Sequence, residues 1–340
     1  MQQVGRCGRV YSVIGKNTPE KLQGTWIMEN AQTVVDTRWN ASEQLRKYAA
    51  WQVKRPLFTS EDASAKLSHK VEGIEAAILN MSPAQSADDI APRYTDDGVR
   101  ILENLCAFSS LGCRMACLAN SGRQVFESTM LAKLGRTMLW QDRTTRKFFL
   151  AKLQREINSL RKRCQKKGLQ PAVRLNGLTD ELWEVKTTII QDNPDVQFYD
   201  YSKWTSRCRQ FAIGWIVPGK IAWPKNYHLT FSRSENTTDA EVIAMLDLGV
   251  NVAVPFATTD KTLPATWLNR EVINADAHDL RFLDKRGVIC GLKVKQSKVN
   301  QLAADQGDAS VGKHRTMDHD FHKGFIVEIG DDVPRLQKGA

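Results

Sequence analysis

Short apolar runs alternate with amphipathic stretches over most of the second half of the chain. The runs are rich in β-branched and aromatic side chains and are bounded by polar residues, which is typical of buried strands. Between several of them, apolar residues recur at helical spacing after an acidic or polar start. The expected strands cover residues 172–175, 196–199, 227–231, 250–254 and 288–294, and the expected helices cover 180–191, 204–213 and 239–248. Strands and helices in alternation predict parallel βα units.

The middle of the chain begins the same pattern with a candidate first strand and a long helical segment. Residues 73–79 form the expected strand, and a polar loop follows it. Apolar residues then recur every three or four positions over 126–164, with a break near 141–145 where a second helix is expected to begin. With this first strand, the six expected strands favour an α/β fold, a partial or complete parallel βα (TIM-like) barrel with an N-terminal helical extension.

The chain divides into three parts by composition. Residues 1–70 are expected to form the N-terminal helical extension, because 28–53 has helical apolar spacing and a polar linker follows at 59–64. Residues 71–330 are expected to form the barrel-like domain, and 331–340 a tail. The segment before this tail holds His314, His319 and His322, which favour a loop or terminal strand with incidental histidines over a metal site.

Three of the seven cysteines lie close together in the segment 106–123. Serines and glycines around Cys106, Cys113 and Cys117 let a loop fold back, and a thiolate is the softest ligand that a protein offers. The set therefore predicts one shared metal ion or iron–sulfur cluster. Three ligands leave one coordination position open, which is how a catalytic metal site differs from a closed structural one.

Two other interpretations of these cysteines stay open. They could be small buried apolar side chains that line the inner side of a loop and a helix start. They could instead hold zinc with a distant fourth ligand, such as His228 or one of the C-terminal histidines. Iron and zinc both accept thiolates, so the spacing does not distinguish them. The odd number of cysteines argues against a disulfide framework.

Polar residues follow the expected strands, and in a parallel barrel these strand ends share the face that carries the active site. The candidates are the catalytic residues Asp200, Ser232 and Glu235 and the cofactor-binding residues Asn176, Asp276 and Lys293. The alternative is that such residues cap helices or form turns. That alternative is favoured for Thr179, Asp180 and Asp239.

The charge of the chain bears on its partners. A formal net charge of +10 and a pI near 9.2 fit an anionic partner such as nucleic acid or a nucleotide. Much of the basic charge lies in residues 155–167, which on a helix form either a solvated face or a phosphate-binding patch. The chain has no apolar run long enough to span a membrane and no secretory signal, so we expect no membrane partner and a cytoplasmic location.

The cysteine segment and the polar strand ends also form a recognisable set. They include Asn226-Tyr-His-Leu-Thr-Phe-Ser-Arg-Ser-Glu235 and Asp276-Ala-His-Asp-Leu-Arg-Phe-Leu-Asp284, together with 106–123, 174–184, 198–203, 249–254 and 291–295. In combination these segments resemble the bacteriophage "gene product 88" family over about residues 75–330. The resemblance implies a phage origin, and hence the host cytoplasm, but it assigns no activity.

The three-cysteine loop after a first strand is similar to the loop of radical S-adenosylmethionine enzymes. In that class the loop holds a 4Fe–4S cluster whose fourth iron binds the methionine part of the cofactor. The similarity therefore implies a 4Fe–4S cluster and S-adenosylmethionine as cofactors. The usual spacing there is C-x3-C-x2-C, whereas this chain has C-x6-C-x3-C and carries Ala116 where an aromatic residue commonly precedes the last cysteine.

Two functions of different kinds follow. The first is an iron–sulfur, radical S-adenosylmethionine-like enzyme, in which the cysteines hold the cluster and the strand-end residues position the cofactor and a substrate. The positive charge favours a nucleotide or nucleic acid as that substrate. The alternative is a zinc-stabilised nucleic-acid-binding phage protein without catalysis, in which basic side chains of one helix meet phosphates. Those side chains are Arg161, Lys162, Arg163, Lys166 and Lys167.

Overall fold

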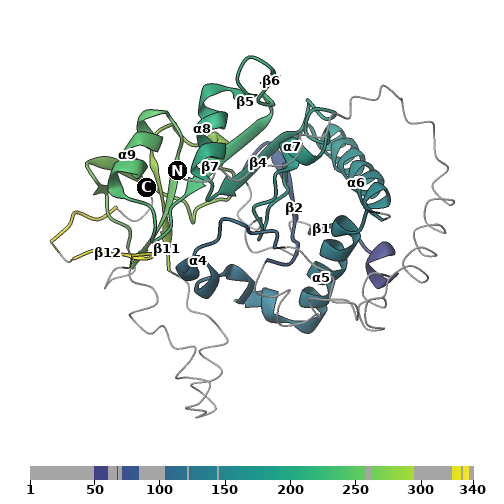
Figure 1. Ribbon diagram of the computed structural model, residues 1–340, viewed down its shortest axis with the longest axis horizontal. Coiled ribbons are helices and arrows are strands. Elements are labelled where there is room, and N and C mark those ends of the chain that lie inside the picture. The colour runs from purple at the N-terminus through teal and green to yellow at the C-terminus, as the bar shows by residue number, and fades with distance from the viewer. Residues whose placement is uncertain are drawn as a thin grey trace, which may run out of the picture.

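The computed structural model describes residues 50–59, 67, 71–83, 104–120, 122–143, 145–257, 262–294, 324–330 and 332–336. Within them the chain forms a mixed α/β fold around a large, mostly parallel sheet (Figure 1). Most of the expected N-terminal extension and its linker, and all three C-terminal histidines, lie outside the described residues.

A series of parallel strands forms the centre of the sheet. In spatial order they are β2 (Ile74–Leu79), β3 (Gln170–Arg174), β4 (Gln197–Ser202), β7 (Tyr227–Ser232), β8 (Val252–Ala257), β11 (Ile289–Lys293) and β10 (Arg270–Asn274). The short strands β1 (Phe58–Thr59) and β9 (Thr266–Trp267) extend the two edges in antiparallel pairing, and β12 (Val327–Glu328) pairs in parallel with β8. All six strands expected from the sequence are confirmed, with small shifts at their ends.

The order of the strands follows the chain from β2 to β11 without a reversal. A βα barrel has this order, whereas a doubly wound sheet reverses at its centre. No pairing between described residues joins the β1 edge to the β9 edge, so this part of the sheet is open and the closed form of the expected barrel is not found there.

Four helices of eight or more residues accompany the sheet in the described part of the chain. They are α5 (Glu127–Gln141), α6 (Arg146–Lys167), α8 (Thr205–Ile213) and α9 (Asp239–Asp247). These match the expected helices, including the break before α6 and the polar start of α9, where Thr238 and Glu241 form a capping box. Gly168, in the left-handed conformation, ends α6.

The prediction of a helix over residues 180–191 is wrong for most of that range. Only α7 (Trp183–Lys186) is helical, and turns follow it. Asp180 does not cap this helix, because its carboxylate instead accepts hydrogen bonds from Ser202 and from Lys203 N. The acidic side chains of this segment thus make long-range contacts that the local helical pattern does not indicate.

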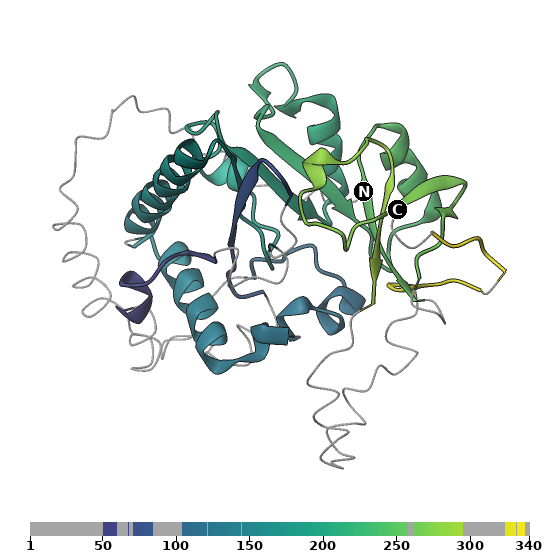
Figure 2. The same cartoon turned by 180° about the vertical axis from the view of Figure 1, so that it is seen from behind.

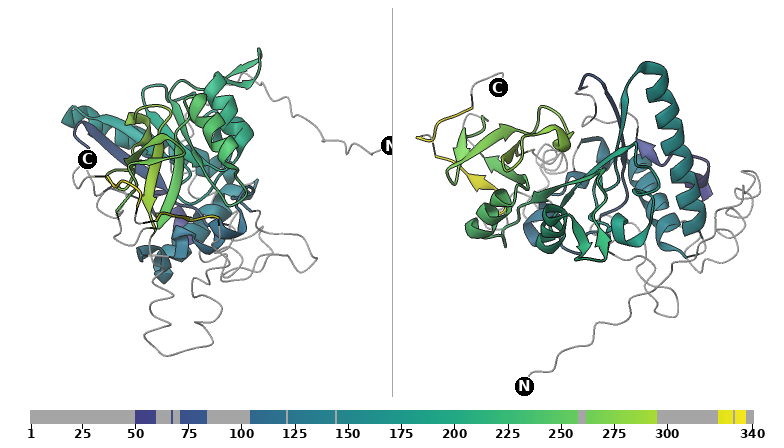
Figure 3. Two further views of the ribbon diagram at one scale, coloured as in Figure 1. Left: turned by 90° about the vertical axis from the view of Figure 1, so that its left-hand side faces the viewer. Right: turned by 90° about the horizontal axis from the view of Figure 1, so that it is seen from above.

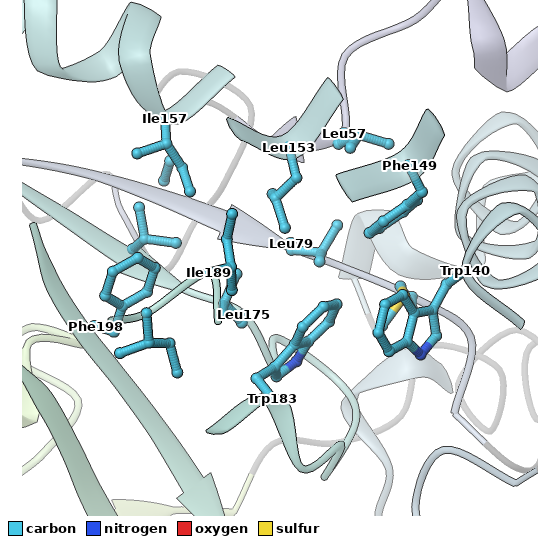
Figure 4. Packing of buried hydrophobic residues seen from close by; sticks show 14 of the residues in the cluster. Leu57, Leu79, Trp140, Phe149, Leu153, Ile157, Leu175, Trp183, Ile189 and Phe198 are labelled. Atoms are coloured by element: carbon cyan, nitrogen blue, oxygen red, sulfur yellow. The ribbon is translucent and has the colours of Figure 1, made fainter. Parts of the chain in front are cut away.

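The main core lies between α5, α6 and the face of β2, β3 and β4 that carries Ala77, Val173 and Phe198. Figure 4 shows Phe149 and Leu153 of α6 packed toward Leu79, with Trp140 and Trp183 beside them. The indoles of Trp140 and Trp183 lie 4.5 Å apart, centroid to centroid. Each fully buried side chain of this size contributes about 1.5–3 kcal/mol.

The opposite face of the sheet is covered by a different segment. Ala76 and Ala172, which alternate with the residues of the main core, pack with Tyr199 and Leu280. Leu280 precedes the short helix η4 (Arg281–Leu283). Helix α6 and the strands around β12 stand at opposite ends of the molecule (Figures 1 and 2), and the view from above in Figure 3 shows the sheet running between them.

Candidate functional site

A cavity of about 110 Å³ brings the three cysteines together. Cys106, Cys113 and Cys117 all line it. One water molecule needs about 10–15 Å³ of such a cavity, so this cavity accommodates a ligand of several atoms. The other lining residues come from the loop after β3, the end of β4 and the end of β7, with one from the segment after β2 and two from the cysteine segment. They are Leu178, Thr179, Asp180, Tyr201, Ser202, Lys203 and Ser232, with Pro83, Ser109 and Arg114.

The cavity thus lies where β3, β4 and β7 end, as expected for a parallel βα architecture. The cysteine segment is tied to this edge by backbone and side-chain contacts. The Asp180 N–H donates to Leu105 O at 2.9 Å, and the Cys106 thiol donates to Leu178 O at 3.3 Å. Among the candidate strand-end residues, Ser232 lines the cavity together with the three cysteines.

Cys113 lies in α4 (Leu111–Met115), a one-turn helix held by a partner distant in sequence. Ser110 caps the helix by accepting from Cys113 N, and its hydroxyl donates to Glu235 Oε2 at 2.6 Å. The N–H of Gly112 donates to Glu235 Oε1 at 2.7 Å. A Cβ on Gly112 would lie 2.6 Å from Phe325 Cβ, so only glycine fits this close approach. Glu235 therefore fixes the orientation of the cysteine helix.

Glu235, a candidate catalytic residue, has both carboxylate oxygens engaged in these contacts. Burial raises the pKa of this carboxyl, but the donors Ser110 and Gly112 outweigh it and the net pKa lies below the ordinary value. The ionised side chain does not line the cavity. Its geometry supports a positioning role.

Lys203 brings a positive charge into the cavity wall. Its ammonium donates to Ser232 Oγ at 2.8 Å and to Arg233 O at 3.2 Å. Burial raises the pKa of the Cys113 thiol, and Lys203 acts against that shift by stabilising the thiolate. The sequence showed Lys203 only as one polar residue after a strand, because its proximity to Cys113 depends on the tertiary fold.

A second lysine lies near Cys117. Lys133 of α5 is fully buried and donates to Gln124 O at 3.1 Å. Burial lowers the pKa of Lys133 to about 8, partly offset by Cys117. Two of the three cysteines thus have a lysine beside them, although burial still leaves the pKa of the Cys113 thiol above its ordinary value.

The described residues contain no preformed group of three His, Cys, Asp or Glu side chains spaced to hold a single metal ion. The donor chemistry nevertheless fits an iron–sulfur cluster, because three soft ligands face one cavity that holds several atoms. His228, considered as a fourth zinc ligand, does not line this cavity. It lies near the start of β7 against Phe211, at the opposite end of the strand from Ser232.

Asn176 and Asp200 form a buried network beneath the cavity wall. Asp200 accepts from Asn176 N at 2.6 Å and from the Tyr227 hydroxyl at 2.8 Å. Asn176 Oδ1 accepts from the Thr179 hydroxyl and from Glu181 N, both at 2.9 Å. Neither Asn176 nor Asp200 lines the cavity. The two residues fix the loop that does so.

Arg207 connects this network to the cavity. Its guanidinium contacts the Glu184 carboxylate in a bidentate pair at 2.7 Å, and also Asp180 at 2.7 Å. The other Asp180 oxygen accepts from the Ser202 hydroxyl and from Lys203 N. Since Arg207 is completely buried, the charge pairs make the wall rigid.

Asp276 and Lys293, the remaining candidate cofactor-binding residues, are adjacent to one another. Lys293 N donates to Asp276 Oδ2 at 2.8 Å, between the loop after β10 and the end of β11. Neither residue lines the cysteine cavity.

Three of the five basic residues of α6 that were considered as a phosphate-binding patch are ion-paired. Arg161 pairs with Asp195 at 2.5 Å, and Arg163 and Lys167 both pair with Glu75, at 2.9 and 2.8 Å. These pairs hold α6 against the sheet edge. Lys162 and Lys166 of the same helix are exposed.

Fold and site together define an α/β protein with a mostly parallel sheet and a three-cysteine cavity at its strand ends. The chain belongs to the bacteriophage "gene product 88" family, whose family model matches residues 56–311. Comparisons with curated proteins and with solved structures gave no match. In the described part of the chain, no helix has both the length and the apolar character needed to cross a membrane.

Proposed function

We propose that this protein binds a 4Fe–4S cluster through Cys106, Cys113 and Cys117 and acts as a radical S-adenosylmethionine-like enzyme. One observation supports this above all: the three cysteines line a single cavity at the ends of parallel strands whose order follows the chain. An open partial barrel with the cysteine loop after its first parallel strand combines the fold and the ligand set that this chemistry needs.

The residues of the chain have separable roles in this proposal. The three thiolates supply three ligands and leave one iron for a further ligand. When bound, the cluster supplies a single electron for reductive cleavage of S-adenosylmethionine. Lys203 stabilises the Cys113 thiolate, and the hydroxyl of Ser232 holds the Lys203 ammonium. Asp180 fixes the backbone from which Lys203 extends.

The candidate catalytic residues take different positions in this proposal. Ser232 lines the cavity, where it would contact a bound ligand. Asp200 and Asn176 hold the wall, and Glu235 orients the cysteine helix. The net charge of +10 supports an anionic substrate of the nucleotide or nucleic acid class.

Elemental analysis with a visible spectrum tests the proposal on protein purified without oxygen. We expect iron and sulfide in the wild type and their loss when Cys106, Cys113 and Cys117 are replaced by alanine. Cys164→Ala is the matched control, because Cys164 is buried in the main core away from the cavity and should keep the metal.

Two results would contradict the proposal. Stoichiometric zinc without iron would support the alternative of a zinc-stabilised nucleic-acid-binding protein. Neither metal would make the cysteines ordinary packing residues. Salt-sensitive binding to DNA or RNA, measured on the same samples, separates these two results.

A further inference from the structure

The sheet divides at the end of β7, next to the cysteine cavity. β7 pairs with β8 only through Phe231 and Ser232, while β11 pairs along the other edge of β8. Further along, β12 takes the place of β7, with Val327 opposite Phe256. Residues 324–329, which we call the covering segment, therefore lie beside the end of β7 and close to α4 (Figures 1 and 2). Ligands commonly bind where neighbouring parallel strands diverge at their carboxyl ends.

The covering segment contacts two cations that follow β4 and β7. Arg233 Nη1 donates to Gly324 O and to Phe325 O, the latter at 3.2 Å. The Lys203 ammonium lies 5.1 Å from the centroid of the Phe325 ring. Phe325 thus covers both cations, with its carbonyl on one and its ring on the other.

The hydrogen bonds of both cations go to neutral groups. Lys203 donates to Ser232 Oγ and to Arg233 O, and it lies beside the Cys113 side chain. Arg233 is only 8% exposed, and its Nε has no hydrogen-bond partner among the described residues. A buried guanidinium with an unused donor is well suited to bind an anion.

The carboxylates of this region are engaged with other groups. Asp180 pairs with Arg207, and both oxygens of Glu235 accept hydrogen bonds from α4 and its cap. Asp239 acts on Arg233 from an exposed position in the first turn of α9. An anion at the two cations would therefore meet some repulsion but would not have to break an ion pair.

The covering segment is held weakly enough to be displaced. Its strand β12 has two residues, and none of residues 324–329 is fully buried. Val327 and Ile329 pack against a core of the protein, but both are only half-buried. Segments with few buried apolar contacts open at a low cost in free energy.

We propose that Arg233, Lys203 and Ser232 form a phosphate subsite beside the cysteine cavity, which the covering segment occupies until a phosphate group displaces Phe325. Phosphate oxygens match the donors of a guanidinium, an ammonium and a hydroxyl. Lys203 and Ser232 also line the cavity, so the rest of a phosphate-bearing substrate extends into it. As a statement about the substrate this rests on the proposed function, whereas phosphate binding itself requires no cluster.

Calorimetric titration of inorganic phosphate into the metal-free full-length protein tests the subsite, at neutral pH and constant ionic strength. Arg233→Gln should bind phosphate about tenfold more weakly, because it loses a charged hydrogen-bond donor. Phe325→Ala should bind it about threefold more tightly, because the competing closed arrangement becomes less populated. A purely structural role of Phe325 predicts the opposite sign for the second variant.

Arg209→Gln is the matched control. It removes the same charge from an exposed position on α8 and should bind phosphate like the wild type. Circular dichroism establishes that all three variants are folded. In competition with phosphate, a nucleoside 5′-monophosphate identifies a free nucleotide as the source of the phosphate group, and a single-stranded oligonucleotide acting alone identifies nucleic acid.

The outcomes separate this proposal from the proposed function. No phosphate binding by the wild type or Phe325→Ala, or equal affinity of Arg233→Gln and the wild type, would overturn the subsite. Equal affinity of Phe325→Ala and the wild type would overturn the role of the covering segment, and competition by neither nucleotide nor oligonucleotide would overturn the substrate class. Iron and sulfide analysis tests the proposed function by itself, since the phosphate titration uses protein without metal.

Discussion

At the scale of single residues, Glu235 connects two parts of the site that are distant in sequence. Its carboxylate accepts from Ser110 and Gly112, which lie 125 and 123 positions earlier in the chain. Glu235 is half-buried, and its removal takes the acceptor from Ser110 and Gly112, both of which are buried. Glu235 therefore controls the position of Cys113 without lining the cavity.

Glu235→Ala should loosen the cysteine helix. We expect faster reaction of Cys113 with a thiol reagent and lower iron content after reconstitution, and smaller changes in Glu235→Gln, which keeps one acceptor oxygen. Asp239→Asn is the control, because Asp239 is an exposed carboxylate in the next helix. Unchanged thiol reactivity in Glu235→Ala would show that the two hydrogen bonds do not hold the helix.

Asp200 makes the stability of the fold depend on pH. Burial raises the pKa of this carboxyl from 3.8 to about 7, against the opposing effects of Arg174 and the Asn176 N–H. The folded chain thus holds the proton on Asp200 more tightly than the unfolded chain does. The resulting contribution of Asp200 to the free energy of unfolding is complete below about pH 4 and is lost as pH rises through 7.

Urea unfolding at several pH values measures this contribution. Asp200→Asn should remove a contribution that falls between about pH 4 and 7, so its free energy of unfolding should rise more, or fall less, over this range than that of the wild type. The lowered pKa of His228 acts in the opposite direction and is the same in both proteins. Asp247→Asn, at an exposed carboxylate paired with Arg270, should leave the slope unchanged. An identical slope in Asp200→Asn would assign the pH dependence to other groups.

The sequence made some of these residues predictable and others not. That the three cysteines lie together could be predicted, because they are near one another in the chain and thiolates have a distinctive ligand chemistry. Lys203 could not be ranked above other polar strand-end residues, and Glu235 was assigned to catalysis. Their roles depend on contacts with α4, which no local pattern encodes.

At the scale of secondary-structure elements, two cases show what local patterns determine. The parallel strands were predictable because buried β-branched runs leave few alternatives. The segment after Asp180 has a helical apolar pattern, yet α7 covers only Trp183–Lys186, and Thr187 is already extended. Arg207 pairs with Asp180 and Glu184, which are long-range contacts that the local pattern does not encode.

Helix α6 should contribute to stability chiefly through its buried face. Leu153→Ala should lower the free energy of unfolding by about 2–5 kcal/mol, because the residue is completely buried in the main core. Arg155→Ala, at an exposed position on the same helix, should change it by about 0.5 kcal/mol or less. Similar losses in both variants would contradict the packing in Figure 4.

Helix α4 should tolerate no side chain at its second position. A methyl group on Gly112 would lie 2.6 Å from Phe325 Cβ and 2.9 Å from Glu235 Oε2. Gly112→Ala should therefore lower the iron content of the protein and change its melting temperature only slightly. Gly73→Asn, at a site with positive φ and open space, controls for loss of a glycine and should retain iron. Equal iron content in Gly112→Ala and the wild type would contradict this close approach.

At the scale of the whole molecule, the core and the cysteine site belong to different parts of the structure. The main core lies between the sheet and α5 and α6, whereas the cavity lies beyond the ends of β3, β4 and β7. Barrel closure could not be predicted from strand count alone, because it depends on pairing between distant edges that no strand pattern specifies.

This separation predicts a local response to metal removal. Hydrogen exchange, compared between iron-loaded and chelator-treated protein, should become faster in residues 104–126 and in the loop 176–183, which are joined by the Asp180 N–H bond to Leu105 O. The amides of β3 and β4 should keep their protection, because the core that covers them contains no cysteine of the site.

Uniform loss of protection across the sheet would show that the metal stabilises the whole fold, as it does in small zinc domains. A response confined to the two segments would place the binding energy in the site, where it can hold the cavity in one arrangement.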